Sequence, residues 1–224
     1  RFQARVARTA ARQPWVRWGL LLGLSVGIAG CTPPGPRALL RGERLVGAGD
    51  YAAAILELES AVRLLPAEAR AYNHLGLAYH GTGRYEDAAA AYQRALQLNR
   101  DLAAARFNLG CLYLDLGNAT NAVAELTSYT ALQPTDPAGW TRLARAQWRS
   151  RQVDAAERSY QRVLQLKPDS AGARNGLGLV LVSRGKYEPA FQQFQAAALE
   201  EGGYAPARLN AAVTAHQYLK NRSL

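Results

Sequence analysis

The sequence predicts an all-α chain in which antiparallel helix pairs stack into a solenoid. A motif of 34 residues repeats without insertion, and apolar residues recur at helical spacing in two runs within each block. A self-similar period of this length is typical of repeat proteins, whose units bury their apolar faces by stacking on neighbours. The blocks start at residues 35, 69, 103, 137, 171 and 205.

Each block is predicted to begin with an amphipathic helix, helix A, and the second block shows the pattern most clearly. Tyr72, Leu75, Gly76 and Tyr79 recur at i, i+3, i+4 and i+7, which places them on one helix face. The eighth place of each block holds a small residue, which permits close approach of helix backbones. These residues are Gly42, Gly76, Gly110, Ala144, Gly178 and Ala212.

A turn and a second amphipathic helix, helix B, follow in each block. Ala88, Tyr92, Ala95 and Leu96 recur at i, i+4, i+7 and i+8. At the fifteenth place, where helix A ends, a left-handed conformation costs glycine least because it has no Cβ. Arg151 is the exception at this place. The other turns have Gly49, Gly83, Gly117 and Gly185, and three of the helices B end before Pro66, Pro134 and Pro168.

These residues resemble the tetratricopeptide repeat, which has an aromatic residue, Leu-Gly and Tyr in helix A, then Ala, an aromatic residue, Ala and Pro through helix B. The resemblance implies a right-handed superhelix over 37–224, with five full repeats and a partial sixth. Arg41 falls where the pattern has Leu, as expected of a terminal unit that caps the stack. The fourth block keeps Trp140, Leu143, Ala156, Tyr160 and Pro168.

Residues 1–30 have the pattern of a signal peptide. Five arginines and no acidic residue precede an apolar run over 19–29, which is shorter than the roughly 18–20 residues that a permanent span needs. The following Ile28-Ala29-Gly30-Cys31 resembles the bacterial lipoprotein box, which implies cleavage before Cys31 and lipidation of that residue. An ordinary secretory signal and an uncleaved anchor are the alternatives.

Residues 31–36 are expected to form a short tether. Thr32-Pro33-Pro34-Gly35-Pro36 is rich in proline, which favours an extended spacer over a helix. The residue after Cys31 is not the Asp that retains lipoproteins in the inner membrane of enteric bacteria. The resemblance therefore implies a lipid anchor in the outer membrane, with the solenoid facing the periplasm.

Composition disfavours several classes of function. The formal net charge of +10 includes the five arginines of residues 1–30, so the rest of the chain is only mildly basic and gives little support for nucleic-acid binding. The histidines His74, His80 and His216 lack the spacing of a metal or catalytic motif, and Cys111 has no second cysteine beyond Cys31. We expect no catalytic residue, metal, cofactor or small-molecule substrate.

Arginines on helix A of the fourth block form the first candidate site. The resemblance implies that helices A line a concave groove, where Arg142, Arg145 and Arg149 lie at i, i+3 and i+7 beside Trp148. Guanidinium groups pair bidentately with carboxylates, and an indole stacks on peptides or cations, so this surface could hold an acidic segment or a C-terminal carboxylate. The alternative is a solvated basic face with Trp148 packed against a neighbouring repeat.

Asparagines form the second candidate site. Asn108 and Asn210 occupy the sixth place of their blocks, and Asn73 and Asn175 lie one place earlier. The resemblance implies that Asn at the sixth place can hydrogen-bond the backbone of a bound peptide, since an amide both donates and accepts. The alternative is that these are ordinary repeat residues without a ligand.

The sequence therefore predicts a non-enzymatic scaffold that binds protein partners. By architecture it resembles lipoproteins that help to assemble pili or secretion machinery. One alternative is an adaptor that recruits cell-wall hydrolases or a periplasmic protease. Another is the repeat portion of a longer enzyme.

Overall fold

The computed structural model describes residues 33–200 and 204–219, so the predicted signal peptide and Cys31 lie outside the described residues. The described part is α-helical, with no strand. Its α-helices are α1 (Pro34–Ala48), α2 (Tyr51–Leu64), α3 (Ala69–Gly81), α4 (Tyr85–Leu98), α5 (Ala103–Asp115), α6 (Ala119–Leu132), α7 (Pro137–Arg149), α8 (Val153–Leu166), α9 (Ala171–Ser183), α10 (Tyr187–Leu199) and α11 (Ala205–Thr214).

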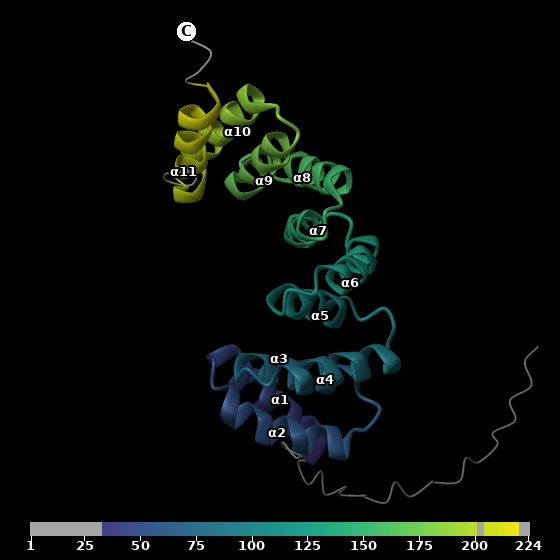
Figure 1. Ribbon diagram of the computed structural model, residues 1–224. Coiled ribbons are helices and arrows are strands. Elements are labelled where there is room, and N and C mark those ends of the chain that lie inside the picture. Colours follow the sequence, from purple (N-terminus) through teal and green to yellow (C-terminus); the bar gives the residue numbers. More distant parts are fainter. Residues whose placement is uncertain (1–32, 201–203, 220–224) are drawn as a thin grey trace, which may run out of the picture. The chain divides into compact units, whose positions relative to one another are not determined.

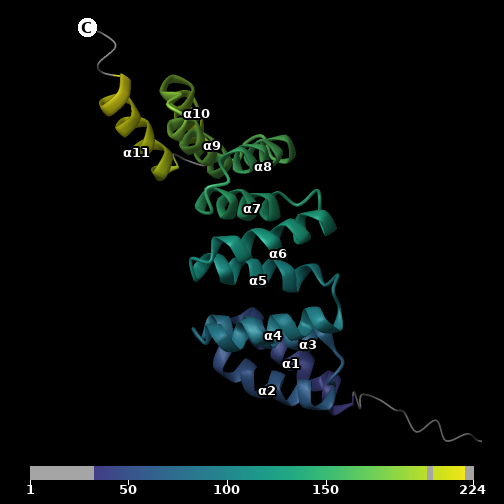
Figure 2. The same cartoon turned by 45° about the vertical axis from the view of Figure 1, so that its right-hand side comes forward.

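Consecutive helices form antiparallel hairpins that stack in chain order (Figures 1 and 2). The odd-numbered helices are the predicted helices A, and α2, α4, α6, α8 and α10 are the predicted helices B. From α3 to α9, each helix A packs on the helix B of its own block and on the helix B before it. The prediction of an all-α solenoid is confirmed. None of the described helices has the length and apolar character that a bilayer span requires.

The start of the solenoid corrects one prediction. Helix α1 begins at Pro34, inside the segment 31–36 that was expected to be extended. Pro34 and Pro36 both lie in the first turn of this helix, where backbone N–H groups have no intrahelical acceptor. Proline therefore loses no hydrogen bond there, and its restricted φ suits the start of a helix.

Within each hairpin, the small residue of helix A faces a large one on helix B. A Cβ added to Gly76 would lie 2.6 Å from the ring of Tyr92, which is fully buried. The fourth block differs, because it has Ala144 at this place. There the ring of Tyr160 lies close to Gly176 of the next block, where an added Cβ would be 2.3 Å away. The equivalent close pairs are Gly42 with Leu58, Gly110 with Leu126, and Gly178 with Phe194.

The turn between helices A and B is left-handed in all five complete blocks. Four blocks use glycine there, with φ between 70° and 79°. Arg151 adopts the same conformation, with φ 64°, and it is the only non-glycine residue at positive φ in the described ranges. A left-handed conformation costs a residue with a Cβ about 1–2 kcal/mol. Every turn therefore has the same backbone shape, but only the fourth is strained.

The stack has an inner and an outer side. Successive helices A contact each other from α1 to α11, whereas successive helices B among the described residues do not. Helices A therefore line the inner side of the stack. At the first hairpin, Arg41 is exposed and lies 3.5 Å from the Glu57 carboxylate on α2.

Candidate functional site

Polar contacts on the inner side join several helices A to the next helix A, most of them with an offset of 35 residues. The Asn108 amide donates to Asn73 Oδ1 at 3.0 Å, and the Asn210 amide donates to Asn175 Oδ1 at 2.8 Å. Each pair is 35 residues apart, which is one repeat plus one residue. These asparagines connect α3 with α5 and α9 with α11.

The structure corrects the prediction that Asn73 and Asn175 line a groove. Asn73 is 4% exposed and Asn175 is 9% exposed, so both amides are buried between hairpins. Asn108 and Asn210 are partly exposed, and each uses its amide N–H to bond its buried partner. A buried amide without a partner is costly, which gives each pair a structural role in holding adjacent hairpins in register.

Charged groups on the inner side of the first three blocks are paired. Glu43 on α1 accepts a hydrogen bond from Arg70 at 2.7 Å and lies 3.3 Å from His74 Nε2, both on α3. His80 Nε2 lies 3.3 Å from Asp115, again 35 residues further along. Burial lowers the pKa of His74 below its ordinary value of 6.5, although the Glu43 carboxylate acts in the opposite direction.

The predicted arginines on α7 divide into two kinds. Arg142 and Arg145 are exposed on the inner side, and neither is within ion-pair distance of a carboxylate in the part of the chain that the structure describes. Arg149 instead donates from Nη1 to the Leu114 carbonyl at 2.9 Å, which ties it to α5. Arg142 and Arg145 therefore keep all of their donors for a ligand, whereas Arg149 has already used Nη1 and keeps its remaining donors.

Trp148 is partly buried, as the packing alternative predicted. Its ring lies against the core cluster of the fourth and fifth blocks, which includes Tyr160 and Leu177. It also lines a pocket of about 350 Å³ beside the turn of the fourth block. The pocket is lined by Trp148, Arg149, Arg151, Val153 and Ser183. Sequence analysis missed this pocket, although the unusual Arg151 in the turn was its visible signal.

Arg142 also acts on a neighbouring thiol. Burial raises the pKa of Cys111 on α5, the positive charge of Arg142 lowers it, and the Asp115 carboxylate raises it. Cys111 is a free, partly exposed cysteine. Its titration therefore reports on the electrostatic potential of the inner side next to Arg142.

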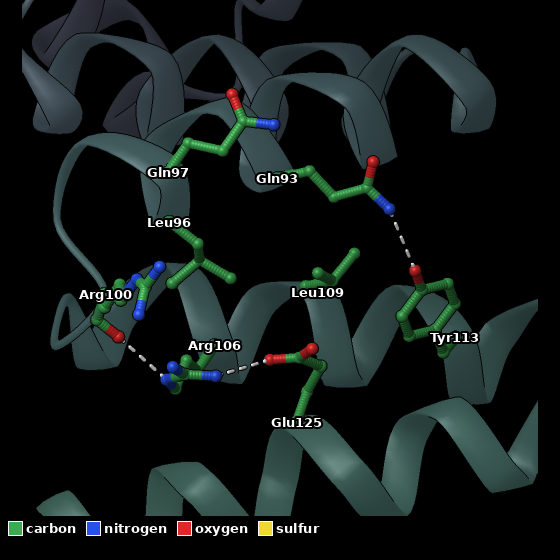
Figure 3. A pocket seen from close by; sticks show the side chains of 8 residues that line it. All are labelled: Gln93, Leu96, Gln97, Arg100, Arg106, Leu109, Tyr113 and Glu125. Atoms are coloured by element: carbon green, nitrogen blue, oxygen red, sulfur yellow. Dashed lines mark hydrogen bonds and ion pairs between the residues drawn. The ribbon is translucent and has the colours of Figure 1, made fainter.

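A different kind of pocket lies between a helix B and the following hairpin. Figure 3 shows one of about 420 Å³, which is lined by Gln93 and Gln97 of α4 and by Arg106 and Tyr113 of α5. Arg106 pairs with Glu125 of α6 at 3.0 Å and donates to the Arg100 carbonyl at 2.9 Å, so its charge is already neutralised (Figure 3). No residue of this pocket was predicted, because three helices from two blocks build it.

The same pocket recurs one repeat later with other side chains. It has a volume of about 530 Å³ and lies between α6, α7 and α8. Gln147 and Ser159 replace Tyr113 and Glu125 at the equivalent places, and the Ser159 hydroxyl donates to Gln147 Oε1 at 2.7 Å. These recurrent pockets differ in chemistry from block to block and hold internal polar pairs. Among the described residues, no three His, Cys, Asp or Glu side chains are grouped as a metal site would need.

Comparison with solved structures identifies the same architecture. MamA from Desulfovibrio magneticus RS-1 superposes with a TM-score of 0.70 at 18% identity, over 75% of this chain and 95% of that one. YrrB, described as a tetratricopeptide repeat protein with an unusual peptide-binding site, also gives a TM-score of 0.70 at 18% identity, over 84% and 91% of the two chains. At these identities the likeness concerns the fold.

Sequence comparison points in the same direction. Superkiller protein 3 of Schizosaccharomyces pombe is 32% identical over 88 residues, which are 39% of this chain and 6% of that protein. The chain thus matches a small part of this relative's length. A sequence profile of the tetratricopeptide repeat matches residues 39–103, 81–137 and 141–206, which together cover most of the chain. The chain therefore belongs to the tetratricopeptide repeat family.

Proposed function

We propose that this protein is a non-enzymatic scaffold that binds an acidic segment of a protein partner on its inner side. Membership of a family of stacked helical repeats supports a binding role, since such solenoids present extended surfaces. The observation that carries the proposal is the pair of exposed, unpaired guanidinium groups of Arg142 and Arg145 on α7.

The contrast with the remaining inner-side charges supports this choice. Glu43, Arg70 and Asp115 are already engaged within the fold, so a ligand would have to break an existing pair to reach them. Arg142 and Arg145 present their donors to solvent at no such cost. A guanidinium group matches the geometry of a carboxylate, which makes Asp, Glu or a C-terminal carboxylate the preferred contact.

Charge reversal tests this proposal. We expect Arg142→Glu combined with Arg145→Glu to weaken capture of cellular partners, in a crosslinking pull-down, by about tenfold or more. Helix content and melting temperature should stay the same, because exposed charges contribute little to stability. Arg44→Glu with Arg158→Glu is the matched control, since both residues are exposed and lie away from the inner-side places. Equal capture by both double variants would refute the proposal.

We further propose that the scaffold is anchored to the outer membrane through lipid on Cys31, facing the periplasm, and serves the assembly of envelope structures such as pili or secretion machinery. The Ile28-Ala29-Gly30-Cys31 motif after a basic and apolar leader supports the anchor. Cys31→Ser should release the protein from membranes after a carbonate wash. Retention of this variant in the membrane fraction would exclude lipidation as the anchor.

A further inference from the structure

The turn of the fourth block has a strained residue that the fold does not require. The other four turns have glycine in the same left-handed conformation, so glycine satisfies the backbone there. The Arg151 side chain is exposed and makes no ion pair or side-chain hydrogen bond within the described ranges. Strained residues are retained where they serve a ligand or a mechanism, and Arg151 has no other evident role.

The pocket beside Arg151 exists because one inter-repeat contact is missing. At the two preceding junctions, the twelfth place of one block contacts the thirteenth of the next: His80 meets Asp115, and the Leu114 carbonyl accepts from Arg149. At the next junction these places hold Trp148 and Ser183. The small Ser183 turns back and donates to the Val180 carbonyl at 2.7 Å, and the space beside Trp148 remains open.

The lining of this pocket combines cationic and apolar side chains. Arg149 is held by the Leu114 carbonyl and Arg151 by the turn, while Trp148 and Val153 supply apolar surface. The acidic residues of the first turns of α8, Asp154 and Glu157, are both paired with Arg184, which is 2.8 Å from Glu157. They therefore do not neutralise the two guanidinium groups of the pocket.

The geometry points to a carboxylate pocket, and we propose that Arg149 and Arg151 together bind a carboxylate of an extended partner segment, with Trp148 and Val153 contacting its adjacent apolar atoms. This inference rests on the proposed binding of an acidic segment to the inner side. The new element is Arg151, which lies in a turn and outside every helix A. Its position determines where along the bound segment the acidic group must lie. The carboxylate belongs either to an Asp or Glu side chain or to a chain terminus.

Arg151→Gly provides a test that cannot fail through misfolding, because glycine already occupies this place in four blocks. The probes are short fluorescent peptides containing a Leu-Glu pair with an amidated C-terminus, Leu-Gln with a free C-terminus, and Leu-Gln with an amidated C-terminus. Binding is measured by fluorescence anisotropy with the full chain. We expect Arg151→Gly to weaken binding of a carboxylate-bearing peptide by about tenfold, with an unchanged or raised melting temperature.

The outcomes separate the two proposals. Weakening confined to the Leu-Glu peptide assigns the pocket to a side chain, and weakening confined to the free C-terminus assigns it to a chain end. Suppose that the Arg142/Arg145 double variant loses binding but Arg151→Gly binds all three peptides like the unchanged protein. The proposal of a carboxylate pocket is then refuted, and the scaffold proposal stands. If the unchanged protein binds no carboxylate-bearing peptide better than the neutral one, both are refuted. Arg158→Ala, which removes an exposed charge from α8, should behave like the unchanged protein.

Discussion

The inner sides of the first three blocks and of the fourth block are built from similar residues but use them differently. In the first three, Glu43, Arg70, His74 and Asp115 are engaged across hairpin junctions. In the fourth, Arg142 and Arg145 have no acidic neighbour within ion-pair distance, in the part of the chain that is described.

This difference distinguishes polar groups that stabilise the stack from charged groups that can bind a ligand. A polar group that is paired inside the stack fixes the register of two hairpins, and it offers little to a ligand. A charged group that lacks an internal partner adds little to stability and keeps its binding capacity. The same helix position can therefore serve either purpose, and the neighbouring repeat decides which one.

The largest effect is expected from breaking a buried junction. Asn73→Ala removes the acceptor of the Asn108 amide and leaves a cavity between α3 and α5. We expect a loss of about 1–3 kcal/mol in the free energy of unfolding, measured by urea denaturation. Arg145→Ala, on the exposed part of α7, should change stability by less than about 0.5 kcal/mol. Equal losses for the two variants would contradict the distinction between the two regions.

A second prediction uses pH to sharpen the comparison. The pKa of His74 is lowered in the folded state, so the unfolded chain binds a proton more readily. The stability that depends on neutral His74 is present above pH 6.5 and is lost as pH falls from 6.5 through the lower folded pKa. As pH is lowered from 7.5 to 5, the free energy of unfolding should decrease less for His74→Gln than for the unchanged protein. Identical decreases would show that burial between the hairpins does not lower the pKa of His74.

A third prediction probes the fourth block through Cys111. Because the charge of Arg142 lowers the pKa of this thiol, Arg142→Gln should raise the pKa further and reduce the thiolate fraction. Alkylation of Cys111 by iodoacetamide at pH 8 should slow, as followed by mass spectrometry of its peptide. Arg158→Gln is the control and should leave the rate unchanged. A rate that does not respond to Arg142→Gln would mean that this guanidinium group lies too far from Cys111 to act on it.

The smallest effect is expected at the strained turn. Arg151→Gly relieves about 1–2 kcal/mol of left-handed strain but adds about 0.5–1 kcal/mol of backbone entropy to the unfolded state. The free energy of unfolding should therefore rise by about 0.5 kcal/mol in urea denaturation. Gly117→Ala, the reverse change at the equivalent turn, should lower it. A loss of stability in Arg151→Gly would show that the arginine has a structural role.

Much of the fold followed from local pattern. The 34-residue period and the helical spacing within it predicted the five complete hairpins and the left-handed turns at the four glycines, because these features depend on residues close together in the chain. The spacing also predicted that Gly76 and its equivalents allow close helix packing. The extended tether was wrong for Pro34 and Pro36, since proline disrupts a helix interior but is accepted in its first turn.

The candidate site was only partly predictable. Arg142 and Arg145 were proposed from their spacing on α7, and both are exposed in the structure, but their role in binding stays a prediction. Asn73 and Asn175 were assigned to the groove, yet they are buried, because a residue's neighbours on the next hairpin are 35 positions away and do not appear in a helical period. The recurrence of Asn at that separation was the available signal, and it was not recognised.

The sequence by itself determined the hairpins of the described residues, where they turn, and which small and large residues pack within them. Only the tertiary structure decided which polar residues face solvent and which are joined across junctions, and it alone revealed the pocket beside Arg151. The physical reason is that helices and turns are set by short-range sterics and hydrophobic spacing. The relative placement of two hairpins depends instead on how their side chains interlock, as the displaced ring of Tyr160 against Gly176 shows.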